Sequence, residues 1–284
     1  MLVWTNSSLY SLQYLGGDTV WGSQLVGDNL SIISPNSVAY VAGVAFWMGT
    51  DTFYSYDGGV LPLPSALRRF VFNDFNYLQA LQVVAGTNEA FNEVWWFYCS
   101  ANATSIDRYV VYNYVDKIWY YGTLSRTAWL DTGTRQYPLA ATSSSNLVNH
   151  EEGVDDNETA TTAAISAYIT SGEFDVADGD RFAFAWRILP DITFDGSTAS
   201  SPAVTMTLYP LNNPGSGYNS PASEGGVSYA DVTRTATLPV EAFTQQLNIR
   251  VRARQLAVKV SSSAVGVQWQ LGSPRIDTRP DGRR

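Results

Sequence analysis

The sequence predicts an all-β protein, in which a partial β-propeller is followed by a β-sandwich or jelly-roll domain. Three observations predict this fold class. A strand–turn–strand unit recurs in the first half of the chain. Tyr, Trp, Val and Thr, which favour strands, are abundant among turn-forming Gly, Ser, Asn and Asp. After residue 165 the chain changes to longer alternating strands without the repeat.

The recurring unit is a short apolar run, a polar turn and a second, alternating run. Its copies span residues 2–14, 45–57 and 94–113, with a fainter copy at 139–150. The spacing of the copies falls within the roughly 40 to 50 residues that are typical of propeller blades. A small twisted sheet cannot bury both of its faces alone, so the sequence predicts blades that need neighbours.

Other elements follow in order along the first half. A helix is predicted to open at Pro64 and Ser65, with apolar residues at helical spacing through Leu78. Residues 94–121 predict three consecutive antiparallel strands. Because a strand follows Met1 at once, we expect a second chain to supply missing blades and cover an apolar edge.

A polar, acidic stretch at residues 143–162 predicts the connection between two domains. We therefore place the propeller blades in residues 1–160 and the β-sandwich, with a basic C-terminal tail, in residues 161–284. The predicted sandwich strands lie at residues 167–174, 181–194, 204–209, 247–254, 256–260 and 267–271.

The formal charge of −9 is unevenly distributed, because residues 246–284 hold eight basic and two acidic residues. An acidic body repels DNA and anionic membranes, whereas a basic end can dock on an acidic surface. The alternating arginines at 250, 252 and 254 share one strand face, where we expect pairing with acids of the same chain. In the polar tail, the sequence predicts partner-binding residues at Arg275, Arg279, Arg283 and Arg284.

The sequence predicts no catalytic residue and no cofactor. His150 is the only histidine, and its position in the fourth unit indicates a blade residue rather than a catalytic base. Glycoside hydrolysis needs paired carboxylates, but the candidate aspartates lie at predicted turns, where Asp commonly bonds the backbone: Asp51, Asp57, Asp107 and Asp131. We therefore expect that the chain is not an enzyme.

The metal and membrane predictions are also negative. Asp175, Asp178 and Asp180 offer oxygen ligands to Ca²⁺, but a hairpin turn explains the same residues, and we predict no metal site. The lone Cys99 excludes an intrachain disulfide. No apolar stretch reaches the ~20 residues of a membrane span, so we expect no membrane anchor.

Three blocks carry a family resemblance: residues 91–98, residues 107–129, and the ending at 268–284. Together they resemble the C-terminal half of the tail hub, or nozzle, proteins of short-tailed bacteriophages, the packaged-DNA stabilisation family. The resemblance covers nearly the whole chain, although family members are longer and carry further blades upstream.

The resemblance implies a structural virion protein, located in the phage tail and made in the host cytoplasm. It implies a homohexameric ring below the portal and adaptor, through which DNA is ejected without specific binding. The implied partners are the adaptor, tail fibres or tailspikes, and a second chain that completes the propeller. A carbohydrate-binding or glycan-degrading β-propeller is the alternative from a different functional class.

Overall fold

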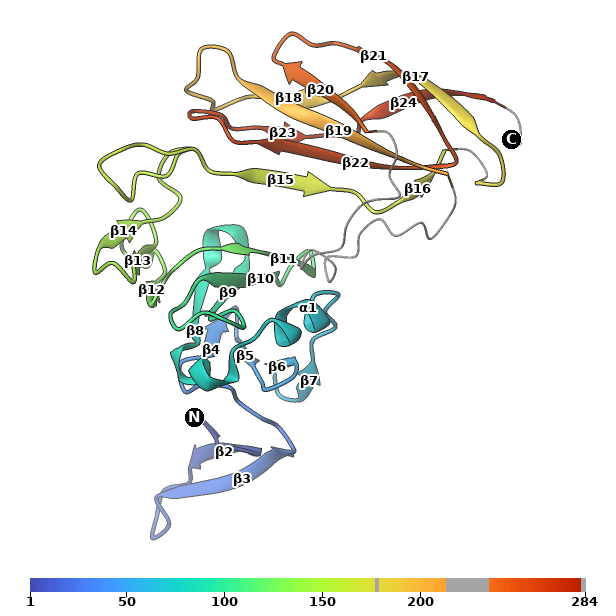
Figure 1. The fold of residues 1–284 in the computed structure, drawn as a ribbon. Coiled ribbons are helices and arrows are strands. Elements are labelled where there is room, and N and C mark those ends of the chain that lie inside the picture. Colours follow the sequence, from blue (N-terminus) through green and yellow to red (C-terminus); the bar gives the residue numbers. More distant parts are fainter. Residues whose placement is uncertain (177–178, 213–234, 282–284) are drawn as a thin grey trace. The chain divides into compact units, whose positions relative to one another are not determined.

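The computed structural model describes residues 1–176, 179–212 and 235–281. The chain divides into two compact units, Met1–Glu152 and Gly153–Arg284, whereas the boundary expected from the sequence lay at residue 160. The all-β prediction is confirmed: in the described ranges, antiparallel strands make up nearly all of the regular structure (Figure 1).

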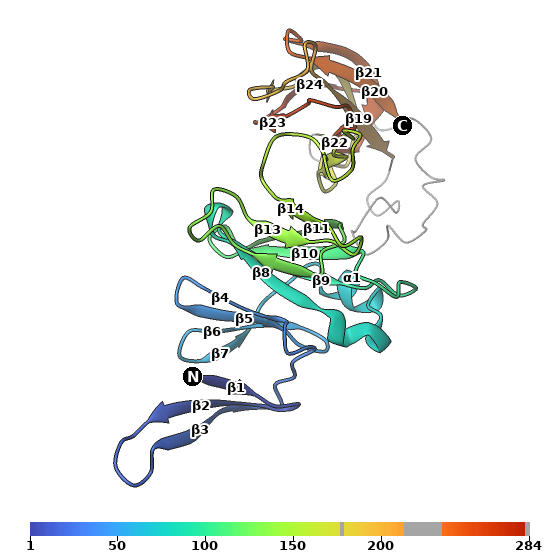
Figure 2. The ribbon, with the colours of Figure 1, turned by 90° about the vertical axis from the view of Figure 1, so that its left-hand side faces the viewer.

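The first unit contains four antiparallel sheets, which follow one another along the chain (Figure 2). The first sheet consists of β1 (Leu2–Trp4), β2 (Ser8–Tyr14) and β3 (Trp21–Asp28). The second consists of β4 (Val38–Val41), β5 (Val44–Met48), β6 (Phe53–Tyr56) and β7 (Val60–Pro62). The third consists of β8 (Val84–Asn88), β9 (Glu93–Tyr98), β10 (Arg108–Asn113) and β11 (Ile118–Thr123). The fourth consists of β12 (Ala128–Leu130), β13 (Leu139–Ala141) and β14 (Leu147–Asn149).

Each copy of the sequence unit folds as an antiparallel hairpin, namely β1–β2, β5–β6, β9–β10 and β13–β14. The second and third sheets are complete four-stranded meanders. Their first strands, β4 and β8, lie against each other, and β12 lies against β8. Among the described residues, the first sheet therefore has no counterpart of β4, and the fourth has no counterpart of β7 or β11.

The register shows that the tryptophans leading the first two copies are not equivalent. Trp4 is paired with Leu9, and Met48 takes the same place by pairing with Phe53. Each pair lies beside an equivalent turn. The Thr5 N–H donates to the Ser8 carbonyl in the first sheet, and the Gly49 N–H donates to the Thr52 carbonyl in the second, both at 2.8 Å. Because neighbouring side chains in a strand point to opposite faces, Trp4 and Trp47 face each other from neighbouring sheets, with ring centroids 5.6 Å apart.

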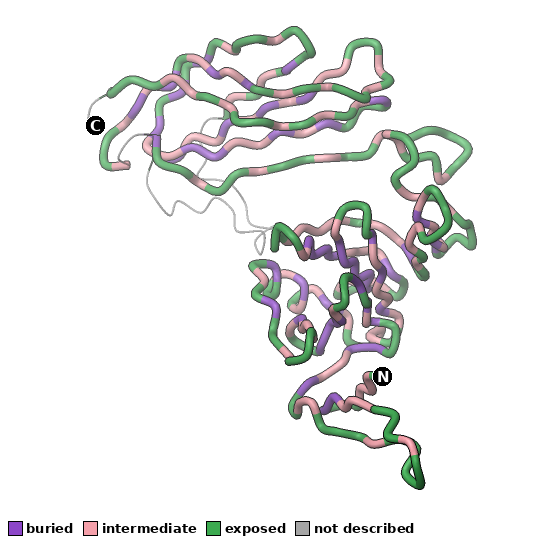
Figure 3. Tube along the Cα trace, turned by 180° about the vertical axis from the view of Figure 1, so that it is seen from behind, coloured by how far each residue is buried: buried purple, intermediate pink, exposed green. Residues whose placement is uncertain are grey.

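The core of the first unit lies between its second and third sheets, where aromatic side chains from both interleave. Phe53 of β6 packs against Trp96 of β9 and Trp119 of β11, with ring centroids 4.9 and 4.7 Å away. Trp96 and Phe53 are fully buried, and the buried residues are purple in Figure 3. Such rings each bury 150–250 Å² and dominate the energetics of a core.

The predicted helix is shorter than its apolar spacing suggests. The α-helix α1 spans Arg68–Asn73 and is followed by the 3₁₀ helix η1 at Tyr77–Gln82; a second 3₁₀ turn, η2, spans Glu89–Phe91. Between α1 and η1, Asn76 is extended, and its side chain accepts a hydrogen bond from the Leu78 backbone N–H. Leu78 is 92% exposed, so it takes no part in the core.

The second unit is a two-layer β structure. One layer has the order β15 (Ala167–Thr170), β22 (Gln255–Ser262), β19 (Ala203–Leu211), β20 (Ala236–Glu241), with β16 (Phe174–Asp175) also paired to β22. The other has the order β21 (Leu247–Ala253), β17 (Ala183–Leu189), β24 (Arg275–Pro280), and a small pair joins β18 (Ile192–Thr193) to β23 (Gln270–Leu271). Buried residues of β17, β19, β21 and β22 share one hydrophobic cluster, as in a sandwich.

Candidate functional site

A buried carboxylate lies at the start of β9, whose residues are all buried. The Trp95 indole N–H donates to Glu93 Oε2 at 2.9 Å, and the Tyr120 hydroxyl donates to Glu93 Oε1. Burial raises the pKa of Glu93, while the two hydrogen bonds act in the opposite direction. Burial therefore disfavours the ionised form of this carboxyl group, and the two hydrogen bonds stabilise that form in part.

A second carboxylate approaches the same place from the end of the first unit. Asn88 of β8 is paired directly with Glu93, and its Nδ2 donates to Glu151 Oε1 at 3.2 Å. Glu151 is exposed as a residue, but partial burial of its carboxyl group raises its pKa, and the charge of Glu93 raises it further. Asn88 Oδ1 is buried and has no hydrogen-bond partner in the described part of the chain.

His150 precedes Glu151 in the chain and is neutral over most of the pH range. The Arg126 Nε–H donates to His150 Nε2 at 2.7 Å, and the ring of Trp129 lies 4.6 Å from the imidazole. Burial, together with the Arg126 charge, lowers the pKa of His150 to about 4. As an acceptor packed on a tryptophan, this histidine joins β14 to the neighbouring strands.

The arrangement joins two carboxyl groups with raised pKa values, which is the electrostatic setting of acid–base chemistry. Both oxygens of Glu93 already accept hydrogen bonds from the third sheet. Glu151 is the member of the pair that is open to solvent. In chemical terms, Glu93 holds strands together, whereas Glu151 accepts a hydrogen bond from Asn88 and is exposed.

The aspartates singled out from the sequence are not brought into this site, except that Asp131 borders β8. Asp131 accepts from the Thr87 hydroxyl at 2.8 Å and from the Glu89 N–H at 3.0 Å. Asp107 accepts from the backbone N–H and hydroxyl of Ser100. Asp107 thus closes the loop between β9 and β10, whereas the donors to Asp131 lie 44 and 42 residues away in the chain, so those bonds join separate elements rather than form a turn.

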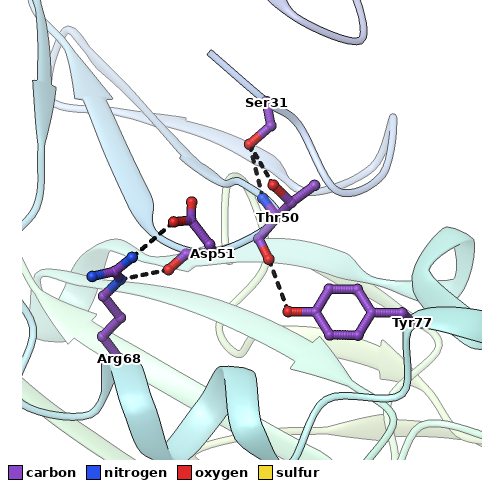
Figure 4. Close-up of polar contacts among 5 residues, drawn as sticks. All are labelled: Ser31, Thr50, Asp51, Arg68 and Tyr77. Carbon is purple, nitrogen blue, oxygen red and sulfur yellow. Dashed lines mark hydrogen bonds and ion pairs between the residues drawn. The ribbon is translucent and has the colours of Figure 1, made fainter. Parts of the chain in front are cut away.

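Asp51 belongs to a separate polar network that ties the β5–β6 turn to its surroundings (Figure 4). Arg68 of α1 donates from Nη2 to Asp51 Oδ2 at 2.7 Å and from Nε to the Asp51 carbonyl at 2.6 Å. Tyr77 donates its hydroxyl proton to the Thr50 carbonyl at 2.9 Å, and the Thr50 N–H donates to Ser31 Oγ. This network holds α1 and η1 against the turn.

The arginines predicted to bind a partner lie at the end of the second unit. Arg275 and Arg279 are exposed on β24, and the Arg279 guanidinium lies 4.9 Å from the ring centroid of Phe184. Arg283 and Arg284 lie outside the described residues. Arg252, one of the alternating arginines, pairs with Asp281 at 2.5 Å.

The aspartates that were considered and set aside as calcium ligands have other contacts where they are described. Asp175 Oδ1 accepts from Gln255 Nε2 at 2.8 Å, and Asp180 pairs with Arg181 at 3.6 Å, whereas Asp178 lies outside the described residues. Within the described ranges, no group of three or more His, Cys, Asp or Glu side chains is placed to hold a metal. Among the helices in those ranges, none is long and apolar enough to cross a membrane.

Exposed apolar side chains gather on the β2–β3 hairpin of the first sheet. Tyr14 and Trp21 stand at its tip in edge-to-face contact, with centroids 5.7 Å apart, and are 70% and 56% exposed. Leu15, Val20 and Leu25 are at least half exposed beside them. In the second unit, Ile169, Phe174, Leu271 and Ile276 line an apolar groove of about 420 Å³.

Sequence reasoning missed Glu93, Asn88 and Glu151. The signal for Glu93 was present, because a glutamate begins a run that is otherwise fully aromatic or aliphatic. A carboxylate in such a strand requires donors to satisfy it. The partners could not be read from the sequence, since Asn88 and Glu151 are separated by 63 residues.

No protein-family model matches the chain, and no curated protein matches it. A solved structure to which it is similar is the exo-β-1,3-galactanase of Phanerochaete chrysosporium in complex with galactose. That match has 9% sequence identity and a TM-score of 0.21, and it covers 95% of this chain. The chain spans 65% of the length of that protein.

This comparison corrects one expectation drawn from the sequence, that the chain is not an enzyme. A structure that the chain matches is a glycoside hydrolase, and Glu93 and Glu151 form a carboxyl pair that the sequence reasoning had not considered. The exclusion of catalysis is therefore withdrawn. At a TM-score of 0.21 the match itself assigns no activity to this chain.

Proposed function

We propose that the chain is a structural subunit of a phage tail hub, forming part of a closed ring around the DNA ejection channel and docking tail fibres or spikes. The observation that carries the proposal is the apolar β2–β3 hairpin, with Tyr14 and Trp21 exposed at its tip. The resemblance of residues 91–98, 107–129 and 268–284 to tail hub proteins supplies the kind of assembly.

The hairpin is an unusual surface for a protein without partners. Exposed Tyr and Trp side chains are enriched where proteins meet, because a ring buries much area at little entropic cost. At about 25 cal/mol per Å², covering two such rings gives a favourable burial term of several kcal/mol, which offsets part of the entropic cost of association. A neighbouring subunit that covers the tip would therefore stabilise a ring.

Charge supports a conduit rather than a DNA-binding surface. The chain carries a formal charge of −9, and most of its basic residues lie in the second unit. A channel lined by phosphate-binding cations would retard passing DNA, because phosphate contacts supply most non-specific affinity. An acidic lining lets DNA pass without being held.

Native mass spectrometry of the assembly isolated with this chain tests the proposal. Six copies in a closed ring, with or without an equal number of a second chain, are expected. The double variant Tyr14→Ser/Trp21→Ser should keep its fold and lose at least tenfold in assembly affinity. A chain that stays a 31.2 kDa monomer in that isolate contradicts the proposal.

A glycan-acting propeller is the second candidate, and the Glu93–Glu151 pair is the observation that favours it. In glycoside hydrolysis one carboxyl group stays protonated while its partner is ionised, and burial together with the charge of Glu93 raises the pKa of Glu151. Release of reducing sugar from a panel of polysaccharides tests this function. Activity lost in Glu151→Gln would support it, and no turnover on the panel would count against it.

A further inference from the structure

In the first unit, the first sheet ends at the free edge of β1. Among the described residues, β1 has β2 as its only strand partner. The matching strands of the next two sheets each have a second partner, since β5 pairs with β4 and β9 pairs with β8. The first sheet thus lacks the strand that begins each four-stranded sheet.

The backbone of β1 is set to receive that strand. Met1 and Leu12 exchange two hydrogen bonds, and the Thr5 N–H donates to the Ser8 carbonyl. Because hydrogen-bonded and non-bonded pairs alternate in an antiparallel ladder, Val3 faces β2, whereas Leu2 and Trp4 direct their N–H and C=O groups to the free edge. In the second sheet, the Met48 N–H, at the place that corresponds to Trp4, donates to the Ser37 carbonyl beside β4.

A buried polar atom next to the edge is also left without a partner. The indole N–H of Trp4 is buried and has no acceptor in the part of the chain that the structure describes. The indole N–H groups of Trp47, Trp96 and Trp129 all donate to backbone carbonyls. Leaving such a donor unpaired costs about 1–3 kcal/mol, and a strand beside β1 would bring carbonyl groups next to Trp4.

We propose that the edge of β1 binds a β-strand from outside the described residues, antiparallel to β1, which completes the first sheet and continues the row formed by β4, β8 and β12. The chemistry of the bound strand follows from β4 and β8, which occupy the same place in their sheets. Both are uncharged, are four or five residues long and begin with valine. The side chains of β1 are themselves uncharged, so main-chain hydrogen bonds supply affinity and a valine facing Val3 sets the register.

Disulfide trapping tests the site and the register together. The probe is a synthetic peptide of residues 31–41, the segment that contains β4, with Val38→Cys. The protein is the full chain with Val3→Cys, because Val3 corresponds to Trp47, which is opposite Val38. Non-bonded pairs bring their Cβ atoms closest, so thiol exchange with oxidised glutathione should join these two cysteines. Cys99 is buried and does not compete.

Two matched controls define the outcome, which is read by intact mass. The variant Gln24→Cys places a thiol on β3, the opposite edge of the same sheet, and a peptide with Ala39→Cys places its thiol on the wrong face. At least tenfold more adduct is expected for the Val3–Val38 combination than for either control. Equal trapping overturns the proposal.

Two further outcomes complete the test. Disulfide-linked dimers of the Val3→Cys chain without peptide would show that β1 of a second copy occupies the edge. That result would overturn the proposal that a strand resembling β4 and β8 binds there. The cysteine-free peptide should slow hydrogen exchange of the Leu2 and Trp4 amides about tenfold and leave the exchange of the Val3 amide unchanged. Unchanged exchange at all three amides would count against the proposal. Neither readout depends on the proposed ring.

Discussion

The Tyr120 hydroxyl donates a hydrogen bond to the Glu93 carboxylate across the intervening strand β10. Glu93 is 8% exposed, and Trp95 donates to its other oxygen. Burial and the neighbouring Glu93 charge raise the pKa of Tyr120, so the phenol stays protonated as a donor. Burial in the third sheet thus disfavours the ionised form of Glu93, and the hydrogen bonds from Tyr120 and Trp95 stabilise that form.

Tyr120→Phe should destabilise the protein more at pH 7 than at pH 4. The variant removes a hydrogen bond to a charged group, which contributes about 1.5–3 kcal/mol, and leaves the ionised carboxylate with one donor fewer. At pH 4 more of Glu93 is protonated, so the loss shrinks. Urea unfolding at the two pH values measures it, with the exposed Tyr40→Phe as the control. An equal loss at both values would contradict the role assigned to Tyr120.

Glu93→Gln should weaken the pH dependence of the free energy of unfolding. Burial raises the pKa of Glu93 above its ordinary value, so the stability it contributes is complete below the unfolded pKa and is lost as pH rises through the folded pKa. A glutamine does not titrate, and the variant should lose less stability than the wild type between pH 4 and pH 7. Thermal unfolding across that range is the measurement, and superimposable pH profiles would refute the raised pKa.

Gly86→Ala should cost about 1–3 kcal/mol of stability by overpacking. A Cβ atom at this position would lie 2.3 Å from Trp129 Cδ1, and Trp129 is stacked on Trp95 with centroids 5.4 Å apart. Gly59→Ala is the matched control, because its Cβ meets nothing within 4 Å. Chemical denaturation of both variants separates a packing cost from a general effect of adding a methyl group.

Arg68→Ala should change stability by no more than about 1 kcal/mol, although the ion pair with Asp51 is short. The two side chains are 53% and 62% exposed, so water and salt screen their attraction. Raising the salt concentration should lessen the difference from wild type further. A loss well above this range in urea unfolding would mean that the network in Figure 4 anchors α1 more firmly than its exposure implies.

Arg275→Glu should weaken assembly with little effect on folding. Arg275 is exposed at the start of β24, and surface substitutions generally change stability by less than about 0.5 kcal/mol. Deleting the tail from Pro280 is a poorer test, because it also removes the partner of Arg252. Sedimentation of the assembly at low and high salt measures the effect, and an unchanged assembly would remove Arg275 from the interface.

The β-rich character and the four hairpins could be predicted because they depend on local information. Alternating residues and polar turns specify a strand–turn–strand unit from neighbours in the sequence. The repeat did not reveal register, since Trp4 and Trp47 look equivalent in the sequence but Trp4 takes the place of Met48. A shift of one residue moves a side chain to the other face of a sheet, and only packing between sheets decides it.

The candidate site depends still more on tertiary structure. Residue types alone pointed to Asp51 and Asp107, which the fold uses at separate turns, while Glu93 attracted no notice. The sequence by itself determined strands, turns, the uneven charge and the presence of a lone histidine. Only the tertiary structure brought Asn88 to Glu151, buried Glu93 within hydrogen-bonding distance of Tyr120 and left the edge of β1 without a second strand among the described residues. Those contacts join residues far apart in the chain, and burial, which sets the pKa values, exists only once the sheets have packed together.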